Sequence, residues 1–123
     1  MPEKIHFRAQ FTIEKDNVAK FKNLIKEMIQ YVETNEPDTL EYQFYLNEDV
    51  TRCIVHETYR SSEATISHNN SIASKTILPR IFNIAKLDKF DVYGNPNGEL
   101  RNILKALNSQ TFTLFTGINR LSE

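Results

Sequence analysis

Two ionisable side chains, Glu57 and His68, lie where an alternating strand pattern gives way to a helical one. An imidazole that is neutral near physiological pH can accept a phenolic proton and leave an electron-rich anion, so His68 is a candidate general base. A histidine near a helix end can equally bond a carbonyl group or water. The sequence leaves both interpretations of His68 open.

Glu57 is the polar exception on one side of a strand that otherwise carries apolar residues, namely Cys53, Val55 and Tyr59. A carboxylate in that position must be paired or have a raised pKa. Glu57 is therefore a candidate catalytic base or a support for His68. It can also cap a helix N-terminus or pair with Arg60 at the strand end, and burial separates these alternatives.

The nearby aromatic and amide side chains are candidate ligand contacts. Tyr42, Phe44 and Tyr59 can line a pocket for a planar molecule. Aromatic residues on the apolar face of a strand also build ordinary core. Asn69 can bind an oxygen or carbonyl group of a ligand, although Asn69 and Asn70 are also typical helix terminators.

Other kinds of site receive little support. His6, His56 and His68 lie in three separate segments without a metal-binding spacing, so we expect no zinc site. Cys53 stands mid-strand among apolar neighbours, which predicts an inert core thiol. The glycines form no phosphate-binding motif, and we expect no metal or cofactor.

The composition predicts one domain, residues 1–123, with 40% hydrophobic and 25% charged residues. The 15 basic and 16 acidic side chains are interspersed, so no basic stripe indicates nucleic-acid binding. The N-terminus does not resemble a signal peptide, and no apolar run is long enough to cross a membrane. A single cysteine fits a reducing compartment, and we expect a cytoplasmic protein without a membrane partner.

The first half of the chain contains strand and helix patterns in turn. Strict alternation over Ile5–Ile13 predicts a strand. The helical spacing of residues 18–32 predicts an amphipathic helix of about four turns, capped by Asp16 or Asn17. Glu36, Pro37 and Asp38 end it.

Two further alternating runs, residues 39–47 and 51–59, flank a polar turn and predict a hairpin. Ser61 or Ser62 can cap a helix that continues to about Asn69.

A helical pattern continues over residues 71–86, with a break or kink at Pro79. Residues 90–93 predict a short strand before a glycine-rich and asparagine-rich turn. A short helix over residues 100–107 and a last strand over residues 111–118 follow.

This order predicts an α+β fold, the ferredoxin-like plait: a four-stranded antiparallel sheet with helices on one face and an extra C-terminal helix and strand. We place the core at residues 5–93 and the extension at 94–123. The other sheet face would carry His6, Arg8, Gln10, Arg52, Ile54, His56 and Thr58. This mixture is too polar for a buried core and in places too apolar for a solvent-exposed surface. A second copy of the sheet, packed face to face in a homodimer, would cover it.

Residues 35–45 read Asn-Glu-Pro-Asp-Thr-Leu-Glu-Tyr-Gln-Phe-Tyr, and Val-His-Glu-Thr-Tyr at 55–59 precedes His68. Together with the strand order, these stretches resemble the antibiotic biosynthesis monooxygenase family over about residues 5–93. Asp38 stands where the family often has Gly, and Tyr59 where many members have Trp. The resemblance implies a dimeric α/β barrel built from ferredoxin-like protomers.

Members of that family include oxygenases that oxidise polycyclic phenols or quinols without metal or flavin, the substrate anion itself reducing oxygen. Other members are isomerases or have no assigned chemistry. Haem-degrading members need a Trp in this region and a later His, both of which this sequence lacks, so that subclass is set aside.

The resemblance thus implies a small-molecule pocket and a first hypothesis of a monooxygenase or related enzyme acting on a small aromatic, quinol-like molecule. His68 would be the base, Glu57 and Asn69 its polar supports, and Tyr42, Phe44 and Tyr59 the walls. The alternative is a non-catalytic dimeric module of the same fold that binds a small molecule or is purely structural. An RNA-binding plait is the weakest alternative, because the basic aromatic strand motif is absent.

Overall fold

The alternating segment near the N-terminus forms the central strand of the sheet. In the computed structural model, which describes residues 3–121, β1 runs over Ile5–Ile13 and buries its odd-numbered side chains. Successive side chains of a strand point to opposite faces, so the alternation produces one apolar and one more polar face. The predicted strand is confirmed.

The first long helix places an apolar stripe against that strand. After a 3-10 turn, η1 (Lys15–Asn17), α1 spans Val18–Asn35 and buries Phe21, Leu24, Met28 and Val32. Its 18 residues make about five turns, one more than predicted. Asn17 occupies the N-cap position, but its side-chain amide donates to Glu14 at 2.8 Å and makes no cap bond, so the predicted capping by Asp16 or Asn17 is wrong.

The predicted hairpin is confirmed as β2 (Thr39–Leu46) and β3 (Arg52–Tyr59), which pair antiparallel. Asn47 organises the turn, since its side-chain oxygen accepts backbone hydrogen bonds from Thr51 at 3.0 Å and Arg52 at 2.9 Å. An asparagine that bonds nearby backbone groups in this way stabilises a tight turn.

Short helices follow the hairpin: α2 (Ser62–Asn69), α3 (Ile72–Thr76) and α4 (Leu78–Phe82). The Ser61 side chain caps α2 by accepting a backbone hydrogen bond from its first turn at 3.1 Å. Pro79 lies in the first turn of α4, where its missing N–H costs no helical hydrogen bond. Both the cap and the predicted break near Pro79 are confirmed.

The fourth strand is longer than the sequence pattern predicted. β4 spans Ala85–Tyr93, whereas the helical pattern was expected to continue to Lys86 and the strand to begin at Phe90. β4 pairs with β1 along its whole length. Pairing with a buried central strand outweighs the local helical spacing.

The C-terminal extension holds α5 (Gly98–Lys105) and a brief strand, β5 (Gln110–Phe112). β5 pairs parallel with the last residues of β4, and β4 itself ends at Tyr93. Residues 113–118 therefore have no strand beside them, and the prediction of a strand over 111–118 is wrong beyond Phe112.

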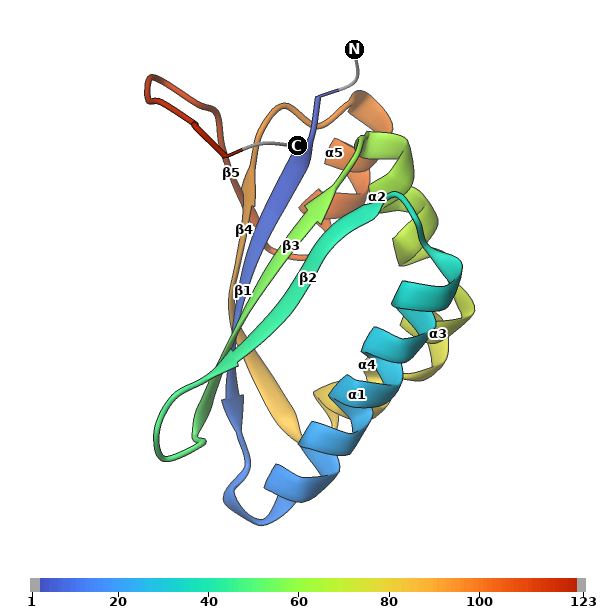
Figure 1. Cartoon of the computed structure of the whole chain (residues 1–123), viewed down its shortest axis with the longest axis vertical. Helices are drawn as coiled ribbons and strands as arrows, with labels where there is room; N and C mark the ends of the chain where they lie inside the picture. The colour runs from blue at the N-terminus through green and yellow to red at the C-terminus, as the bar shows by residue number, and fades with distance from the viewer. Residues whose placement is uncertain (1–2, 122–123) are drawn as a thin grey trace.

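The sheet has the order β2-β3-β1-β4-β5, antiparallel except for the last pair. This is the predicted ferredoxin-like plait with the extra C-terminal strand added at its edge. Figure 1 shows the helices on one side of the sheet, and no helix of residues 3–121 covers the other side. The dimeric barrel stays a prediction.

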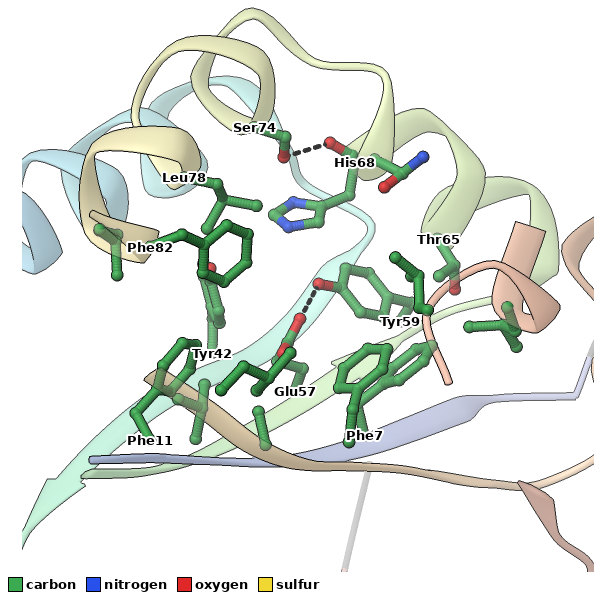
Figure 2. Close-up of a pocket in the computed structure, with 18 of the residues that line it drawn as sticks. Phe7, Phe11, Tyr42, Glu57, Tyr59, Thr65, His68, Ser74, Leu78 and Phe82 are labelled. Atoms are coloured by element: carbon green, nitrogen blue, oxygen red, sulfur yellow. Dashed lines mark hydrogen bonds between the residues drawn. The ribbon is translucent and has the colours of Figure 1, made fainter. Parts of the chain in front are cut away.

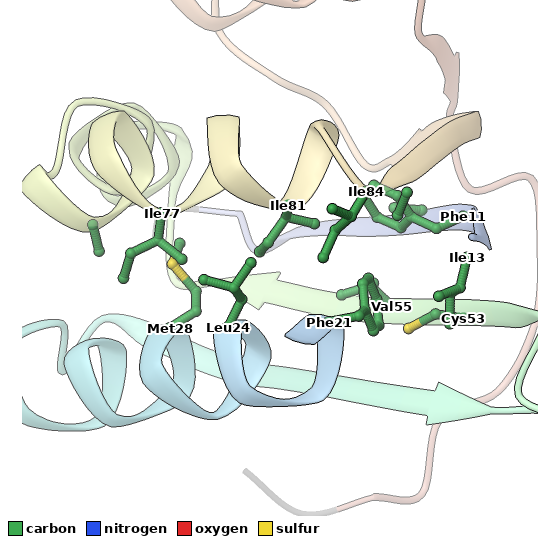
Figure 3. Packing of buried hydrophobic residues seen from close by; sticks show 13 residues of the cluster. Phe11, Ile13, Phe21, Leu24, Met28, Cys53, Val55, Ile77, Ile81 and Ile84 are labelled. Carbon is green, nitrogen blue, oxygen red and sulfur yellow. The ribbon is translucent and has the colours of Figure 1, made fainter. Parts of the chain in front are cut away.

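The core fills the space between sheet and helices as two clusters. The larger lies under α1 and α4 and is drawn in Figure 3; it includes Phe11, Phe21, Leu24, Met28, Val55 and Ile81. The smaller lies under α5 and consists of Ile5, Phe7, Tyr59, Val92, Leu100 and Leu104. Residues of both clusters border the cavity described next.

Candidate functional site

An apolar cavity of about 180 Å³ lies between the sheet and the helices. Its floor comes from strand residues such as Phe7 and Val55, and its roof from helical residues such as Leu78 and Ile81. A dry cavity of about 150 Å³ can hold a benzene ring. The volume therefore suits a molecule about the size of one aromatic ring.

His68 reaches into this cavity from the last turn of α2 and is only 7% exposed. The Ser74 hydroxyl donates to the His68 carbonyl oxygen at 2.6 Å and ties the end of α2 to α3. Figure 2 shows the imidazole above the carboxyl group of Glu57, with Tyr59 on one side and Tyr42 on the other. The His68 and Glu57 side chains therefore border the same cavity.

A second carboxylate, that of Glu36, hydrogen-bonds His68. Nδ1 of His68 lies 2.6 Å from Oε1 of Glu36, which follows the end of α1. The Thr39 hydroxyl donates to the same oxygen at 2.9 Å, and Oε2 is buried without a partner among residues 3–121. Burial works to raise the Glu36 pKa, but the hydrogen bond and charge of His68, with the Thr39 bond, lower it below its usual value.

Glu57 has the opposite electrostatic environment. Its carboxyl group projects from β3 on the helix side of the sheet, and the Tyr59 hydroxyl donates to Oε1 at 2.5 Å. Burial raises the pKa of Glu57, although the His68 charge and the Tyr59 hydrogen bond oppose the shift. Glu57 is therefore a candidate proton donor on the wall opposite His68.

Burial and the neighbouring Glu57 raise the pKa of the Tyr59 hydroxyl well above its usual value, so it remains a hydrogen-bond donor. One of the interactions predicted for Glu57 is not one that the structure shows. Arg60 pairs with Asp38 at 2.9 Å, so the alternative of a Glu57–Arg60 pair is wrong. The carboxyl group that hydrogen-bonds His68 is that of Glu36, whereas Glu57 interacts with the ring through its charge.

Aromatic rings enclose the imidazole. The Tyr42 ring centroid lies 5.4 Å from that of His68, edge to face, and the Tyr59 ring lies 5.1 Å away. Tyr42 also packs against Phe44 with their centroids 4.9 Å apart. Tyr42, Phe44 and Tyr59 all line the cavity, although Tyr59 also belongs to the smaller core cluster.

The amide side chains are placed differently. Asn69 ends α2 and borders the cavity, but it is exposed at the rim. Asn70 is the C-cap residue of α2, as predicted for a terminator. Asn69 can therefore meet only a ligand that extends toward the cavity opening.

The outer wall of the site is polar. A second pocket, of about 300 Å³, lies between α2 and the turn from α1 to β2, and both His68 and Glu36 border it. Glu36 could not have been selected from the sequence, because Glu36-Pro37-Asp38 reads there as a helix-ending turn. Its bond to His68 joins residues separated by 32 positions in the chain.

The remaining candidates lie away from the cavity. His6 bonds the Thr58 hydroxyl at 2.9 Å, and His56 packs against Tyr45 on the same outer face of the sheet. Cys53 is buried, and burial raises the pKa of its thiol to about 11. Residues 3–121 contain no group of three or more acidic, histidine or cysteine side chains placed to hold a metal ion.

Within the part of the chain that the structure describes, every helix is too short or too polar to cross a membrane.

Comparisons with solved structures show the same fold. The structure of MupZ from Pseudomonas fluorescens matches with a TM-score of 0.84 and 22% sequence identity, over 96% of this chain and 95% of that chain. The structure of an antibiotic biosynthesis monooxygenase matches with a TM-score of 0.62 and 18% identity, over 72% and 92% of the two chains. Rv0793 from Mycobacterium tuberculosis matches with a TM-score of 0.65 and 19% identity, over 77% and 97%.

A search of curated proteins finds no significant match. The sequence model of the family described as "Antibiotic biosynthesis monooxygenase" matches residues 5–80, which include the cavity residues of β1 to α3. The match covers more than half of the chain and ends shortly before β4. The chain therefore belongs to the antibiotic biosynthesis monooxygenase family.

Proposed function

We propose that this protein is a cofactor-independent monooxygenase, or a related enzyme, that acts on a small aromatic, quinol-like molecule in the cavity. The observation that carries the proposal is the position of His68, buried between the rings of Tyr42 and Tyr59 at the wall of an apolar cavity. Family membership and the similarity to a solved antibiotic biosynthesis monooxygenase support it.

The proposed reaction begins with proton transfer. A phenolic or enolic O–H bond of the substrate breaks, its proton binds His68, and the substrate anion becomes electron-rich enough to reduce O₂. The substrate loses two hydrogen atoms and gains one oxygen atom, and the second oxygen atom of O₂ leaves as water. Glu57 supplies a proton to oxygen on the opposite side of the cavity, and Asn69 binds the part of the substrate at the rim.

The cavity favours one-ring substrates over the polycyclic phenols that the family resemblance suggested. Its volume of about 180 Å³ is little more than the approximate space that holds benzene. The polar groups that face a ligand are few and are set among apolar walls, which is typical of small-molecule sites.

Oxygen uptake with one-ring quinols and with larger anthrone-like phenols tests this proposal. We expect the wild-type protein to consume oxygen fastest with one-ring quinols and His68→Ala to lose about 100-fold or more of that rate. Ile72→Ala is the control, because Ile72 is 70% exposed on α3 and borders neither the cavity nor the outer sheet face, and it should keep the wild-type rate. Equal rates in wild type and His68→Ala, or no uptake at all, would remove the oxygenase mechanism.

The second candidate function is a non-catalytic binding module. The observation in its favour is that His68 and Glu57 each have a hydrogen-bond partner within the protein, Glu36 and Tyr59 respectively. Calorimetric binding of quinols without oxygen uptake would select this alternative.

We also propose that two copies pack face to face through the sheet side without helices. This face carries apolar side chains among polar ones, including Tyr45, Ile54 and Tyr93. The segment after β5 extends on this side of the molecule (Figure 1) and exposes Leu114, Phe115, Ile118 and Leu121. An exposed apolar surface of this kind is typical of a protein interface.

A cytoplasmic location completes the proposal. Cys53 is the only cysteine of the sequence and is buried, so the fold has no need of an oxidising compartment.

A further inference from the structure

His68 and Glu36 stand in the wall between two pockets of different character. His68 borders both the apolar cavity and the polar outer pocket, whereas Glu36 borders only the outer one. Their side chains are 9% and 13% exposed, so the bond between them is largely shielded from water. When His68 accepts a proton from a ligand on the cavity side, the other side of its imidazole ring is hydrogen-bonded to the Glu36 carboxylate.

The hydrogen bonds of Glu36 determine which ring nitrogen of His68 carries a proton. Oε1 of Glu36 accepts from the Thr39 hydroxyl, and its pKa is lowered, so the group is ionised at neutral pH. An ionised carboxylate can only accept hydrogen bonds. Nδ1 of His68, 2.6 Å from the same oxygen, must then be the protonated nitrogen. In the neutral ring, Nε2 keeps a free lone pair.

We propose that Glu36 is a positioning residue that holds His68 in the tautomer with a basic Nε2 toward the cavity and stabilises the imidazolium formed when a ligand is deprotonated. This deepens the proposed function and rests on it for the identity of the ligand. The ligand O–H bond breaks and an Nε2–H bond forms. The positive ring then lies against the negative carboxylate of Glu36, which keeps its charge throughout.

The other titratable groups that face His68 are Tyr42, Tyr59 and Glu57; Glu57 interacts with the ring through its charge, and none of the three hydrogen-bonds it. Tyr42 from β2 and Tyr59 from β3 have hydroxyl pKa values raised well above the usual value, and both remain neutral. Glu57 from β3 accepts its hydrogen bond from Tyr59. Within residues 3–121, the imidazole forms its hydrogen bond with Glu36 alone.

The ring tautomer is the direct test. We expect long-range ¹H–¹⁵N correlation spectra of the full chain at about pH 8, where free imidazole is neutral, to show His68 protonated at Nδ1. Glu36→Ala should move the proton to Nε2, whereas Glu36→Gln should leave it on Nδ1, because the amide oxygen still accepts. Glu63→Gln removes an acid from the same outer pocket without touching His68 and should change nothing.

A coloured one-ring phenol, 4-nitrophenol, tests the electrostatic part. Wild-type protein should bind it as the yellow anion under mildly acidic conditions in which the free phenol is mostly neutral. Glu36→Gln keeps the tautomer but not the charge, so its affinity for the anion should fall by about tenfold or more. Glu63→Gln should bind it as wild type does.

The outcomes separate this inference from the proposed function. His68 protonated at Nε2 in wild type, or an unchanged tautomer in folded Glu36→Ala, would overturn the inference whether or not the protein consumes oxygen. If Glu36→Ala does not fold, wild-type affinity for the anion in Glu36→Gln would overturn it. The expected tautomers and affinities without oxygen uptake would support the role of Glu36 and remove only the oxygenase reaction.

Discussion

Glu36 and Glu57 lie on different sides of one imidazole, and their surroundings shift their pKa values in opposite directions. Glu36 accepts hydrogen bonds from His68 and Thr39 at the polar outer wall. Glu57 faces an apolar cavity with one hydroxyl as its donor. The hydrogen bonds and the charge of His68 keep Glu36 ionised, whereas burial favours the protonated form of Glu57.

The raised pKa of Glu57 predicts a pH-dependent cost of its buried charge. The protonated form of Glu57 contributes to the free energy of unfolding. This contribution is fully present below the ordinary pKa of 4.5 and is lost as pH rises through the folded-state pKa. Glu57→Gln is neutral and its amide oxygen can still accept from Tyr59. We expect the variant to match wild type near pH 4 and to exceed it by on the order of 1 kcal/mol near pH 8 in urea unfolding.

Glu36→Gln is the control with the opposite sign. Because the Glu36 pKa is lowered, its stabilisation is present above the ordinary value of 4.5 and is lost as pH falls through the folded-state pKa. The variant should therefore be less stable than wild type at neutral pH and approach it in acid. For Glu57 the contradicting result would be a Glu57→Gln protein that is less stable than wild type near pH 8. That result would show that the buried Glu57 charge does not destabilise the fold.

At the scale of single elements, the link from β4 to α5 requires a particular backbone conformation. Gly94 has φ of +129°, and an added Cβ would lie 3.0 Å from the backbone oxygen of Lys4. Its N–H donates to the Phe112 carbonyl at 2.9 Å, which joins this link to β5. Residues with a Cβ rarely adopt such a φ.

Gly94→Ala should therefore destabilise the fold by roughly 1–3 kcal/mol, measured by urea or thermal unfolding. Gly98→Ala is the matched control, since Gly98 lies in the first turn of α5 with no atom within 4 Å of an added Cβ. It should be neutral or stabilising by up to about 1 kcal/mol. Equal losses in the two variants would show that the strain at Gly94 is not the cause.

The elements with a sustained local pattern were predictable from the sequence. The alternation of β1, the apolar stripe of α1 and the serine cap of α2 each depend on neighbouring residues. The start of β4 and the end of β5 depend instead on partner strands. Their bounds could not be predicted, because strand pairing joins residues far apart in the chain.

At the scale of the whole molecule, the uncovered sheet face predicts self-association. Ile54 lies on this face in β3, beside Tyr45 on β2. We expect wild-type protein to sediment as a dimer and Ile54→Lys to weaken the dimer by about tenfold or more, because a lysine would be buried without a partner.

Ile72→Lys makes the same change on α3, where Ile72 is 70% exposed on the helical side of the molecule. This control should sediment like wild type. A monomeric wild-type protein, or equal behaviour of the two variants, would rule out the sheet-to-sheet dimer.

The sequence by itself determined the fold class and, for β1, β2 and β3, the side of the sheet on which the alternating residues lie. Both follow from periods of two and about 3.6 residues, which are local properties of the chain. It also indicated His68, Glu57 and the aromatic residues as a group, because they lie in strand and helix segments that the fold brings together.

Only the tertiary structure decided how those residues are paired. The turn after α1 places Glu36 against His68, 32 positions later in the chain, and Tyr59 rather than Arg60 bonds Glu57. The direction of each pKa shift follows from these contacts and from burial. The side-chain pairings and the pKa shifts cannot be read from the local spacing of residues, because they depend on which surfaces pack together when the helices cover the sheet.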